Sequence, residues 1–550
     1  MMPRPFRRLA ACAAAVLLAL VAAPRLGSQA PRFYADDPLA VEPETQEASK
    51  AAPWEIDLVY DLAHAYFATG RRRIEGVRAG NVNTVDEVPD SSWFTNRIGS
   101  RPLSLAEIRT GPVEHPPPAT GTWTLLREKS AGFAAGFTAR DSAGATWFVS
   151  FDAPGNPDGA SAALVVATKL FWALGYNQVE YHLAPLRRAD IRIDPKATMR
   201  RPSGRRTPLS SDDLAAVLER ARPRADGSYR IAAGRLLPGR ILGGFKYEGT
   251  RPDDPNDLVP HQHRRELRAL RVFGAWTNLT DMKAGNTLDT VVGEGRAARV
   301  RHYLQDVGST FGVGAAGPHD WSEGWEYVLQ AGPALRRLFS LGFALSPWQV
   351  VPVVDHPSIG RFEGEAFDPL TWKPRAPVAA YNEMRDDDAF WAARKVMAFS
   401  DEAIRAAVAS GEFSDPRAAE LLAGVLIARR DRIGRAYLPR INPIVDPALD
   451  AGGIRFGNAA VDHRVATAPR RYLAQWFDFD NATGAVRDLG VTSADGPALA
   501  APPGLADAGP FVRVDLWAEH PGQPTWSRPI VVHFRRMAAG WTPVGLVRQP

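Results

Sequence analysis

The chain has 550 residues, a formal net charge of +5 and 45% hydrophobic side chains. This hydrophobic content excludes a chain that is disordered throughout, and the length is sufficient for two or three domains. Arginines scattered along the sequence carry most of the positive charge, so no nucleic-acid partner is expected. Because Cys12 is the only cysteine, no disulfide within the chain stabilises the fold.

Residues 1–30 are predicted to be an export signal. A basic start with Arg4, Arg7 and Arg8 precedes an apolar run over residues 9–23. The run is shorter than the roughly 20 residues that cross a bilayer as a helix, so no transmembrane domain is expected beyond this segment. The protein is therefore expected to be exported to the periplasm, the cell envelope or the outside of the cell, with the signal either cleaved or kept as an anchor.

The first half of the mature chain divides into three predicted parts. Residues 31–121 form an N-terminal extension and linker, with a helix over 56–69 and a proline-rich end. Residues 122–200 form a β-rich unit in which short strands alternate with glycine-containing turns, followed by an amphipathic helix. Residues 201–260 are predicted to be an insertion that contains one helix. The expected strands of the β-rich unit are 123–126, 133–139 and 146–151, and its helix is 160–174.

The second half is predicted to be helical first and β-rich afterwards. Residues 261–457 show helical periodicity over 263–276 and in three later segments, 391–399, 401–409 and 415–437. From residue 458 to 550 the pattern changes to short strand-like runs between turns, which indicates an all-β module of ordinary domain size. The fold class is therefore predicted to be α+β.

The most informative stretch is residues 276–312. Asp281, Lys283 and Asn286 precede two apolar runs that predict a β-hairpin, and Asp306-Val-Gly308 follows it. Phosphoryl transfer needs a carboxylate that accepts the proton of the acceptor, a cation near the transferred phosphate, and hard oxygen ligands for magnesium. In this interpretation Asp281 is the base, Lys283 steadies the phosphoryl group, and Asn286 and Asp306 bind Mg²⁺.

This order of helix, loop, hairpin and Asp-x-Gly resembles the protein-kinase-like superfamily, in particular divergent HipA-type and secretory-pathway kinases. Asp281-Met-Lys-Ala-Gly-Asn286 is similar to the catalytic loop of kinases, and Asp306-Val-Gly308 stands where Asp-Phe-Gly is expected. The resemblance departs from the pattern at Leu279-Thr280, where kinases have His-Arg. It implies a two-lobed kinase-like fold with an N-terminal extension and a C-terminal all-β module.

The resemblance also implies a nucleotide site in the β-rich unit. Residues 129–136, which contain Lys129, Gly132 and Gly136, take the place of the glycine-rich loop that covers the phosphates. The lysine of the third strand and its partner glutamate are replaced by Ser150 and Leu164. Lys129 is the candidate that compensates for this loss. The implied cofactors are Mg²⁺ and ATP or another nucleotide, and the acceptor is not identified.

Three functions are compatible with these residues. The first is an exported kinase-like phosphotransferase, and the second is a catalytically degenerate, pseudokinase-type binding protein of the envelope. The third is a metal-dependent hydrolase that uses His261, His263 and His302 as zinc ligands. A cleft that holds Asp281, Asn286, Asp306 and Lys129 together would favour the phosphotransferase. Histidines that converge on one point would favour the hydrolase.

Overall fold

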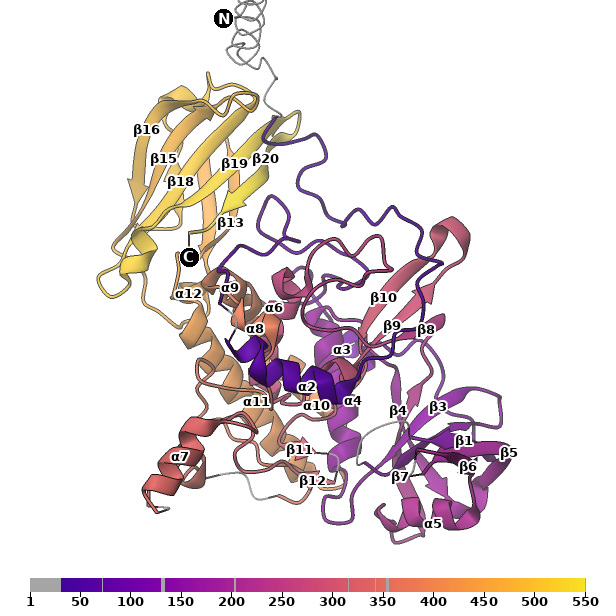
Figure 1. The fold of residues 1–550 in the computed structure, drawn as a ribbon. Coiled ribbons are helices and arrows are strands. Elements are labelled where there is room, and N and C mark those ends of the chain that lie inside the picture. Colours follow the sequence, from indigo (N-terminus) through magenta and orange to yellow (C-terminus); the bar gives the residue numbers. More distant parts are fainter. Residues whose placement is uncertain are drawn as a thin grey trace, which may run out of the picture.

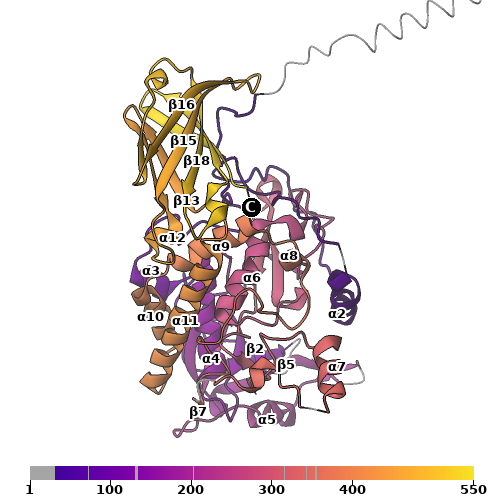
Figure 2. The same cartoon turned by 90° about the vertical axis from the view of Figure 1, so that its left-hand side faces the viewer.

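The computed structural model describes residues 31–71, 73–129, 134–201, 204–314, 316–341, 343–352 and 356–549. The predicted signal segment and Gly132 lie outside the described residues. Figures 1 and 2 show three layers along the long dimension of the molecule: a large sheet, a helical middle part and the C-terminal strands. Within the described ranges, no helix has the length and apolar character that crossing a bilayer requires.

The first layer is a seven-stranded sheet with the order β4-β7-β3-β2-β1-β5-β6 (Figure 1). The three strands predicted for residues 122–152 are present and form an antiparallel meander. Burial alternates along the first and third of these strands, because one face of the sheet packs on a core built around Trp123, Trp147 and Phe151, whereas the middle strand is buried over most of its length. The strands are β1 (Trp123–Glu128), β2 (Gly136–Arg140), β3 (Thr146–Phe151), β4 (Tyr181–Arg187), β5 (Ile191–Arg200), β6 (Arg206–Pro208) and β7 (Ser228–Arg235).

The sheet extends beyond the predicted boundary at residue 200. Strand β7, from the segment expected to be an insertion, pairs with both β3 and β4. Local patterning cannot reveal this, since the partner strands precede β7 by many residues. The helix of this segment is α5 (Ser211–Glu219), which begins with a capping box between Ser210 and Asp213 and packs Leu214 and Leu218 into the core of the sheet.

Helix α4 (Gly159–Leu174) packs on the sheet as the sequence predicts, and most of its side chains are buried. Gly175 ends it with a φ of 129°, a conformation that favours glycine. The ring of Phe94 also lies where a Cβ of residue 175 would be, at 2.2 Å. The glycine is therefore required both by the backbone and by the packing of the N-terminal extension.

A second, three-stranded sheet carries the predicted hairpin. Strands β9 (Thr287–Val292) and β10 (Arg299–Leu304) pair in antiparallel register, and β8 (Arg240–Gly243) adds to β9. The hairpin follows α6 (Arg265–Thr277) and the short helix η4 (Ala284–Asn286). The predicted order of helix, loop and hairpin is thus confirmed.

The helical middle part contains the three predicted later helices. Their bounds are α9 (Asp386–Met397), α10 (Asp401–Ala409) and α11 (Pro416–Tyr437). Asp415 caps α11 and Pro416 occupies its first turn, where proline is favoured. The other described helices are α2 (Leu58–Phe67), α3 (Leu105–Thr110), α7 (Ala331–Phe339), α8 (Ala379–Asn382), α12 (Ala459–Asp462), η1 (Thr69–Arg71), η2 (Arg188–Asp190), η3 (His261–His263), η5 (Gly295–Ala297), η6 (Pro347–Gln349), η7 (Pro503–Leu505) and η8 (Pro524–Ser527).

The C-terminal part consists mainly of strands, and these begin before the predicted boundary at residue 458. Its larger sheet has the order β16-β15-β18-β19-β20, and a smaller one has the order β13-β14-β17. Phe33 of the N-terminal extension packs against Phe479 and His533 of the larger sheet, so the two ends of the described chain meet there. The strands are β13 (Ile444–Asp450), β14 (Gly453–Asn458), β15 (Arg471–Phe479), β16 (Val486–Ala494), β17 (Ala498–Ala500), β18 (Phe511–Glu519), β19 (Ile530–Met537) and β20 (Gly540–Val547); a small hairpin, β11 (Val313–Gly314) and β12 (Gly317–Pro318), lies in the middle part.

Buried ion pairs join α6 to its neighbours. Arg265 and Arg268 of α6 both bind the carboxylate of Asp388 on α9, with nitrogen to oxygen distances of 2.9 Å. All three side chains are inaccessible to solvent. Arg265 also contacts Asp86 of the N-terminal extension at 3.0 Å. The extension and α9 thereby fix the helix that leads into the loop at Asp281.

Candidate functional site

A cleft of about 710 Å³ lies between the seven-stranded sheet and the loops around the hairpin. This volume falls within the range of about 300–1,000 Å³ that small-molecule sites occupy. The sheet and α4 contribute Lys129, Phe137, Val149, Ser150, Leu164 and Tyr181, and the loops contribute Asp281, Lys283, Asn286, Asp306, Ser309, His319, Glu323 and Arg375. The cleft therefore gathers Lys129 and all four residues predicted from the 276–312 stretch.

The loop from Asp281 to Asn286 is closed by its own hydrogen bonds. The Asn286 side-chain amide donates to the Asp281 carbonyl at 2.6 Å, which spans the loop. The Lys283 ammonium donates to Asp281 Oδ2 at 2.8 Å, and the Arg375 guanidinium lies 3.3 Å from the same oxygen. The Asp281 carboxylate is thus held between two cations at the edge of the cleft.

Burial would by itself raise the pKa of the Asp281 carboxyl. The charges of Lys283 and Arg375, with the hydrogen bonds from Lys283 and Asn286, outweigh the burial and hold the pKa below its usual range. The group is consequently ionised at neutral pH. An ionised carboxylate at this position is able to accept a hydrogen bond, and then a proton, from a hydroxyl group in the cleft.

Asp306 follows the hairpin directly and lies beside Asn286. The Asn286 carbonyl accepts hydrogen bonds from the backbone N–H groups of Gln305 and Asp306, both at 3.0 Å. Asp306 Oδ1 accepts the N–H of Gly308 at 3.1 Å, and no residue in the described ranges bonds to Oδ2. The two ends of the hairpin are therefore adjacent, as the sequence predicts, and both side chains border the same cleft.

The described residues contain no cluster of three or more histidine, cysteine, aspartate or glutamate side chains that is suited to a metal ion. Asn286 and Asp306 instead provide an amide and a carboxylate. Mg²⁺ typically takes one or two carboxylates from a protein and completes its octahedron with water and substrate phosphates. This donor set fits such an ion, and the expected spacing of about 5 Å or less between the two side-chain oxygens stays a prediction.

Lys129 directly follows β1 and borders the cleft, whereas Gly136 allows close packing between neighbouring strands of the sheet. A Cβ at residue 136 would lie 2.4 Å from the Val149 carbonyl and 3.6 Å from Cδ of Lys129. Strand packing therefore accounts for this glycine, and its predicted role in nucleotide binding remains a prediction. Ser150 and Leu164 both border the cleft, and a Cβ at Gly308 would meet Cδ2 of Leu164 at 2.8 Å. The residue of α4 that borders the cleft near Gly308 is thus apolar, where the resemblance would require a glutamate.

Three residues of the cleft, Arg375, Glu323 and His319, were missed by the sequence analysis. Arg375 Nε and Nη2 donate to the two oxygens of Glu323, each at 3.0 Å, and Thr280 donates to Glu323 at 2.6 Å. His319 Nε2 lies 2.9 Å from the Ser309 hydroxyl, and burial lowers its pKa to about 4, so the ring is neutral at pH 7. No local motif marks these residues, because each reaches the Asp281 loop from a distant segment.

The histidines proposed for a hydrolase are engaged elsewhere. Both ring nitrogens of His261 have partners, the Lys246 carbonyl and the Asp257 carboxylate. His263 accepts from Arg268 at 2.8 Å and faces Glu75 at 3.1 Å. His302 is stacked on Trp93 and binds Asp289 at 2.8 Å. The rings of His261 and His263 therefore have no nitrogen left for zinc in this arrangement.

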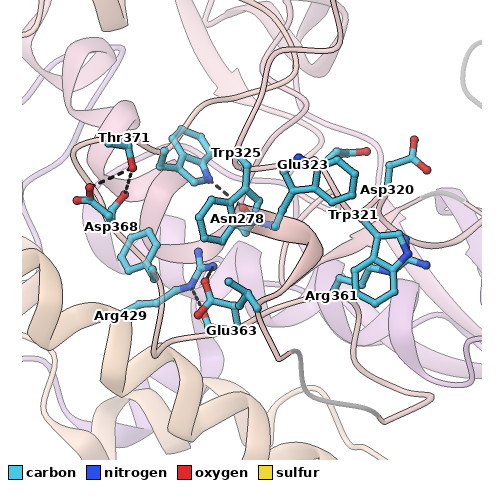
Figure 3. A pocket seen from close by; sticks show the side chains of 15 residues that line it. Asn278, Asp320, Trp321, Glu323, Trp325, Arg361, Glu363, Asp368, Thr371 and Arg429 are labelled. Carbon is cyan, nitrogen blue, oxygen red and sulfur yellow. Dashed lines mark hydrogen bonds and ion pairs between the residues drawn. The ribbon is translucent and has the colours of Figure 1, made fainter. Parts of the chain in front are cut away.

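A smaller pocket lies behind Glu323 and is lined by tryptophans (Figure 3). Its volume of about 30 Å³ has room for about one water molecule. Arg429 in its wall lies 4.2 Å from the ring centres of both Phe362 and Phe367 and donates to the Glu363 carbonyl. This pocket is a packed junction of the helical part and is too small for a nucleotide.

Comparisons with protein-family models, with curated proteins and with solved structures found no match.

Proposed function

We propose that this protein is a divergent, exported kinase-like phosphotransferase that uses Mg²⁺ and ATP or another nucleotide. The observation that carries the proposal is the convergence of Asp281, Lys283, Asn286, Asp306 and Lys129 on one cleft. These residues come from two different layers of the structure, and a chance motif in the sequence would not require them to meet.

The arrangement of the elements supports a two-lobed kinase-like fold. A β-meander (β1 to β3) is followed by a helix, α4, and by two further strands of the same sheet: β7 pairs with β3, and β4 pairs with β7. The candidate loop and the residues that flank the hairpin follow α6 in the chain and line the other side of the cleft. In this proposal, the β-rich layer covers one side of the nucleotide and the reacting groups lie on the other side.

The proposed chemistry assigns one task to each residue. Asp281 takes the proton of the acceptor hydroxyl as that oxygen bonds to the terminal phosphorus, and Arg375 keeps the carboxylate in place. The bond from this phosphorus to its bridging oxygen breaks, and the nucleotide leaves with one phosphate fewer. Lys283, whose side chain is partly exposed, contacts the transferred phosphoryl group. Mg²⁺ at Asn286 and Asp306 would neutralise the charge on the phosphates.

Lys129 is proposed to replace the missing strand lysine. Lys129→Ala is expected to weaken nucleotide binding by about 10–100-fold, because hydrogen bonds to charged groups contribute about 1.5–3 kcal/mol. Isothermal titration calorimetry with Mg²⁺-ATP measures the change. Lys196 is an exposed lysine of β5 in the same sheet, so Lys196→Ala is the matched control. This substitution should leave the nucleotide affinity unchanged. Equal affinity of the Lys129 variant and wild type would remove this residue from the site.

Asp306 is proposed to act through the metal. Asp306→Asn is expected to lower Mg²⁺-dependent nucleotide affinity by about 10–100-fold. Substitution of a residue that only supports a metal ligand already has an effect of this size on metal affinity. Without Mg²⁺, the variant and wild type should bind nucleotide equally, so titration in EDTA is the internal control. A loss of affinity that persists in EDTA would show that Asp306 contacts the nucleotide or the fold instead.

The deciding experiment is nucleotide binding by the purified chain with and without Mg²⁺, followed by release of the terminal phosphate. Binding with phosphate release or transfer supports the enzyme. Absence of any Mg²⁺-dependent nucleotide binding would overturn the proposal. Because ATP is scarce outside the cytoplasm, the titration should include other nucleoside triphosphates and diphosphates.

A second candidate function is a nucleotide-binding envelope protein without turnover. Leu164, an apolar residue packed near Gly308, favours it, because no glutamate on α4 is available to pair with a phosphate-binding lysine. Binding without phosphate release would select this candidate.

A further inference from the structure

Helix α7 presents its apolar side to solvent. Leu335, Leu338 and Phe339 form one stripe at helical spacing and are 49–82% exposed, and none of the helix is buried. The helix is attached to the protein through a polar residue instead: Arg337 donates to Glu326 and to Ser346, both at 3.1 Å. A surface helix in water normally has the opposite orientation, with its apolar stripe against the core.

The exposed apolar surface continues on both sides of α7. Leu341 and Phe343 after the helix are 86% and 87% exposed, and Val328 and Leu329 before it are also exposed. Leu329 N–H donates to the Tyr66 hydroxyl of α2 at 3.2 Å, which joins this segment to a second helix with exposed apolar residues. We call the whole surface the apolar rim; it comprises Val59, Tyr60 and Phe67 of α2, and Val328, Leu329, Leu335, Leu338, Phe339, Leu341, Phe343 and Leu345.

The rim is adjacent to the cleft. The Tyr66 hydroxyl that binds Leu329 also donates to the carbonyl of Arg375, whose guanidinium holds Asp281. Leu58, at the start of α2, borders the cleft itself. Figures 1 and 2 both show α2 and α7 on the same side of the molecule. Monomeric proteins rarely expose contiguous apolar surface of this kind unless it binds something.

We propose that the apolar rim inserts into the surface of a lipid bilayer that contains anionic lipids. Residues 327–352 include no aspartate or glutamate, and their only charged side chains are Arg336 and Arg337. Arg336 is exposed beside the apolar stripe, where it suits a lipid phosphate. The export signal predicted for residues 1–30 would independently bring the chain to a membrane.

The shape of the rim favours a bilayer over a second copy of the chain or another protein. Its most exposed side chains, Leu341 and Phe343, project from an irregular segment and not from a flat strand or a groove. A fluid hydrocarbon layer accepts such protruding side chains, whereas a protein partner needs matching pockets. The inference does not depend on the phosphotransferase proposal, because it concerns the surface and not the cleft chemistry.

A fluorophore placed on the rim tests this directly in the full-length chain. In a Cys12→Ser background, Phe343→Cys carries an environment-sensitive label, and Val491→Cys on β16, also exposed, carries it as the matched control. With vesicles of phosphatidylcholine and phosphatidylglycerol, the label at residue 343 is expected to shift to the blue and to be quenched by brominated acyl chains. The control should show neither change, so that anchoring through residues 1–30 alone cannot produce the result.

Two variants tie the signal to the proposed contacts. Adding Leu338→Asp and Phe339→Asp should abolish the shift, and Arg336→Glu should lower vesicle affinity at least about fivefold, since each basic residue near an anionic surface contributes about 1 kcal/mol. An unchanged label at residue 343 in the presence of vesicles would overturn the proposal. A blue shift of the label that appears without vesicles as the protein concentration rises would also overturn the proposal, because it would show that the rim binds a second copy of the chain.

Discussion

Replacing Asp281 by asparagine is expected to lower turnover of any phosphoryl-transfer reaction by about 10²–10⁴-fold, the usual contribution of a general base. Asparagine keeps the shape of the side chain and can still bond to Lys283 and Arg375, but it cannot accept the proton of the acceptor. Affinity for the Mg²⁺-nucleotide complex should stay within a factor of a few, because the base acts on the acceptor. Single-turnover phosphate release and calorimetry measure the two quantities.

Asp320→Asn is the matched control for this variant. Asp320 borders the same cleft and is exposed, so the substitution removes the same charge without removing the proposed base. Its turnover should equal that of wild type. If Asp281→Asn and Asp320→Asn reduce turnover equally, the effect is electrostatic and Asp281 is not the base; if Asp281→Asn is fully active, the assignment fails.

Asp388→Ala is expected to lower the free energy of unfolding by about 3–5 kcal/mol, the cost of breaking a buried ion pair. The substitution leaves the guanidinium groups of Arg265 and Arg268 buried without the carboxylate that both of them bind. It also removes the acceptor for the Arg385 N–H at the start of α9. Urea denaturation monitored by tryptophan fluorescence measures the loss, and hydrogen exchange locates it.

The neighbouring Asp386 gives a control on the same helix. Its pair with Arg440 is partly exposed on both sides, so Asp386→Ala should cost no more than about 1 kcal/mol. Exchange of the amides in α6 and α9 should accelerate in the Asp388 variant and not in the Asp386 variant. Equal protection in both would mean that the buried pair does not hold these two helices together.

The sequence by itself determined most individual elements and one part of the candidate site. Period-two patterning located β1, β2 and β3, and the Asp-Pro signal located the start of α11. The predicted hairpin is present because its apolar runs and glycine turn are local properties, and it brings Asp306 next to Asn286. Residues that lie close together in the chain, or that are joined by one hairpin, can be placed from sequence for this reason.

Only the tertiary structure decided which distant groups meet. Strand β7 lies inside the first sheet, between β4 and β3, and Arg375 pairs with Asp281, although neither position carries a motif. The structure also decided which histidines are free to bind a metal. His261 bonds to Asp257 and to the Lys246 carbonyl, and His263 bonds to Arg268 and faces Glu75, so their ring nitrogens are occupied. No element was predicted for residues 331–339, and which side of α7 faces solvent depends on the attachment of Arg337. These contacts depend on packing between segments, and the periodic pattern of one segment does not show which other segment packs against it.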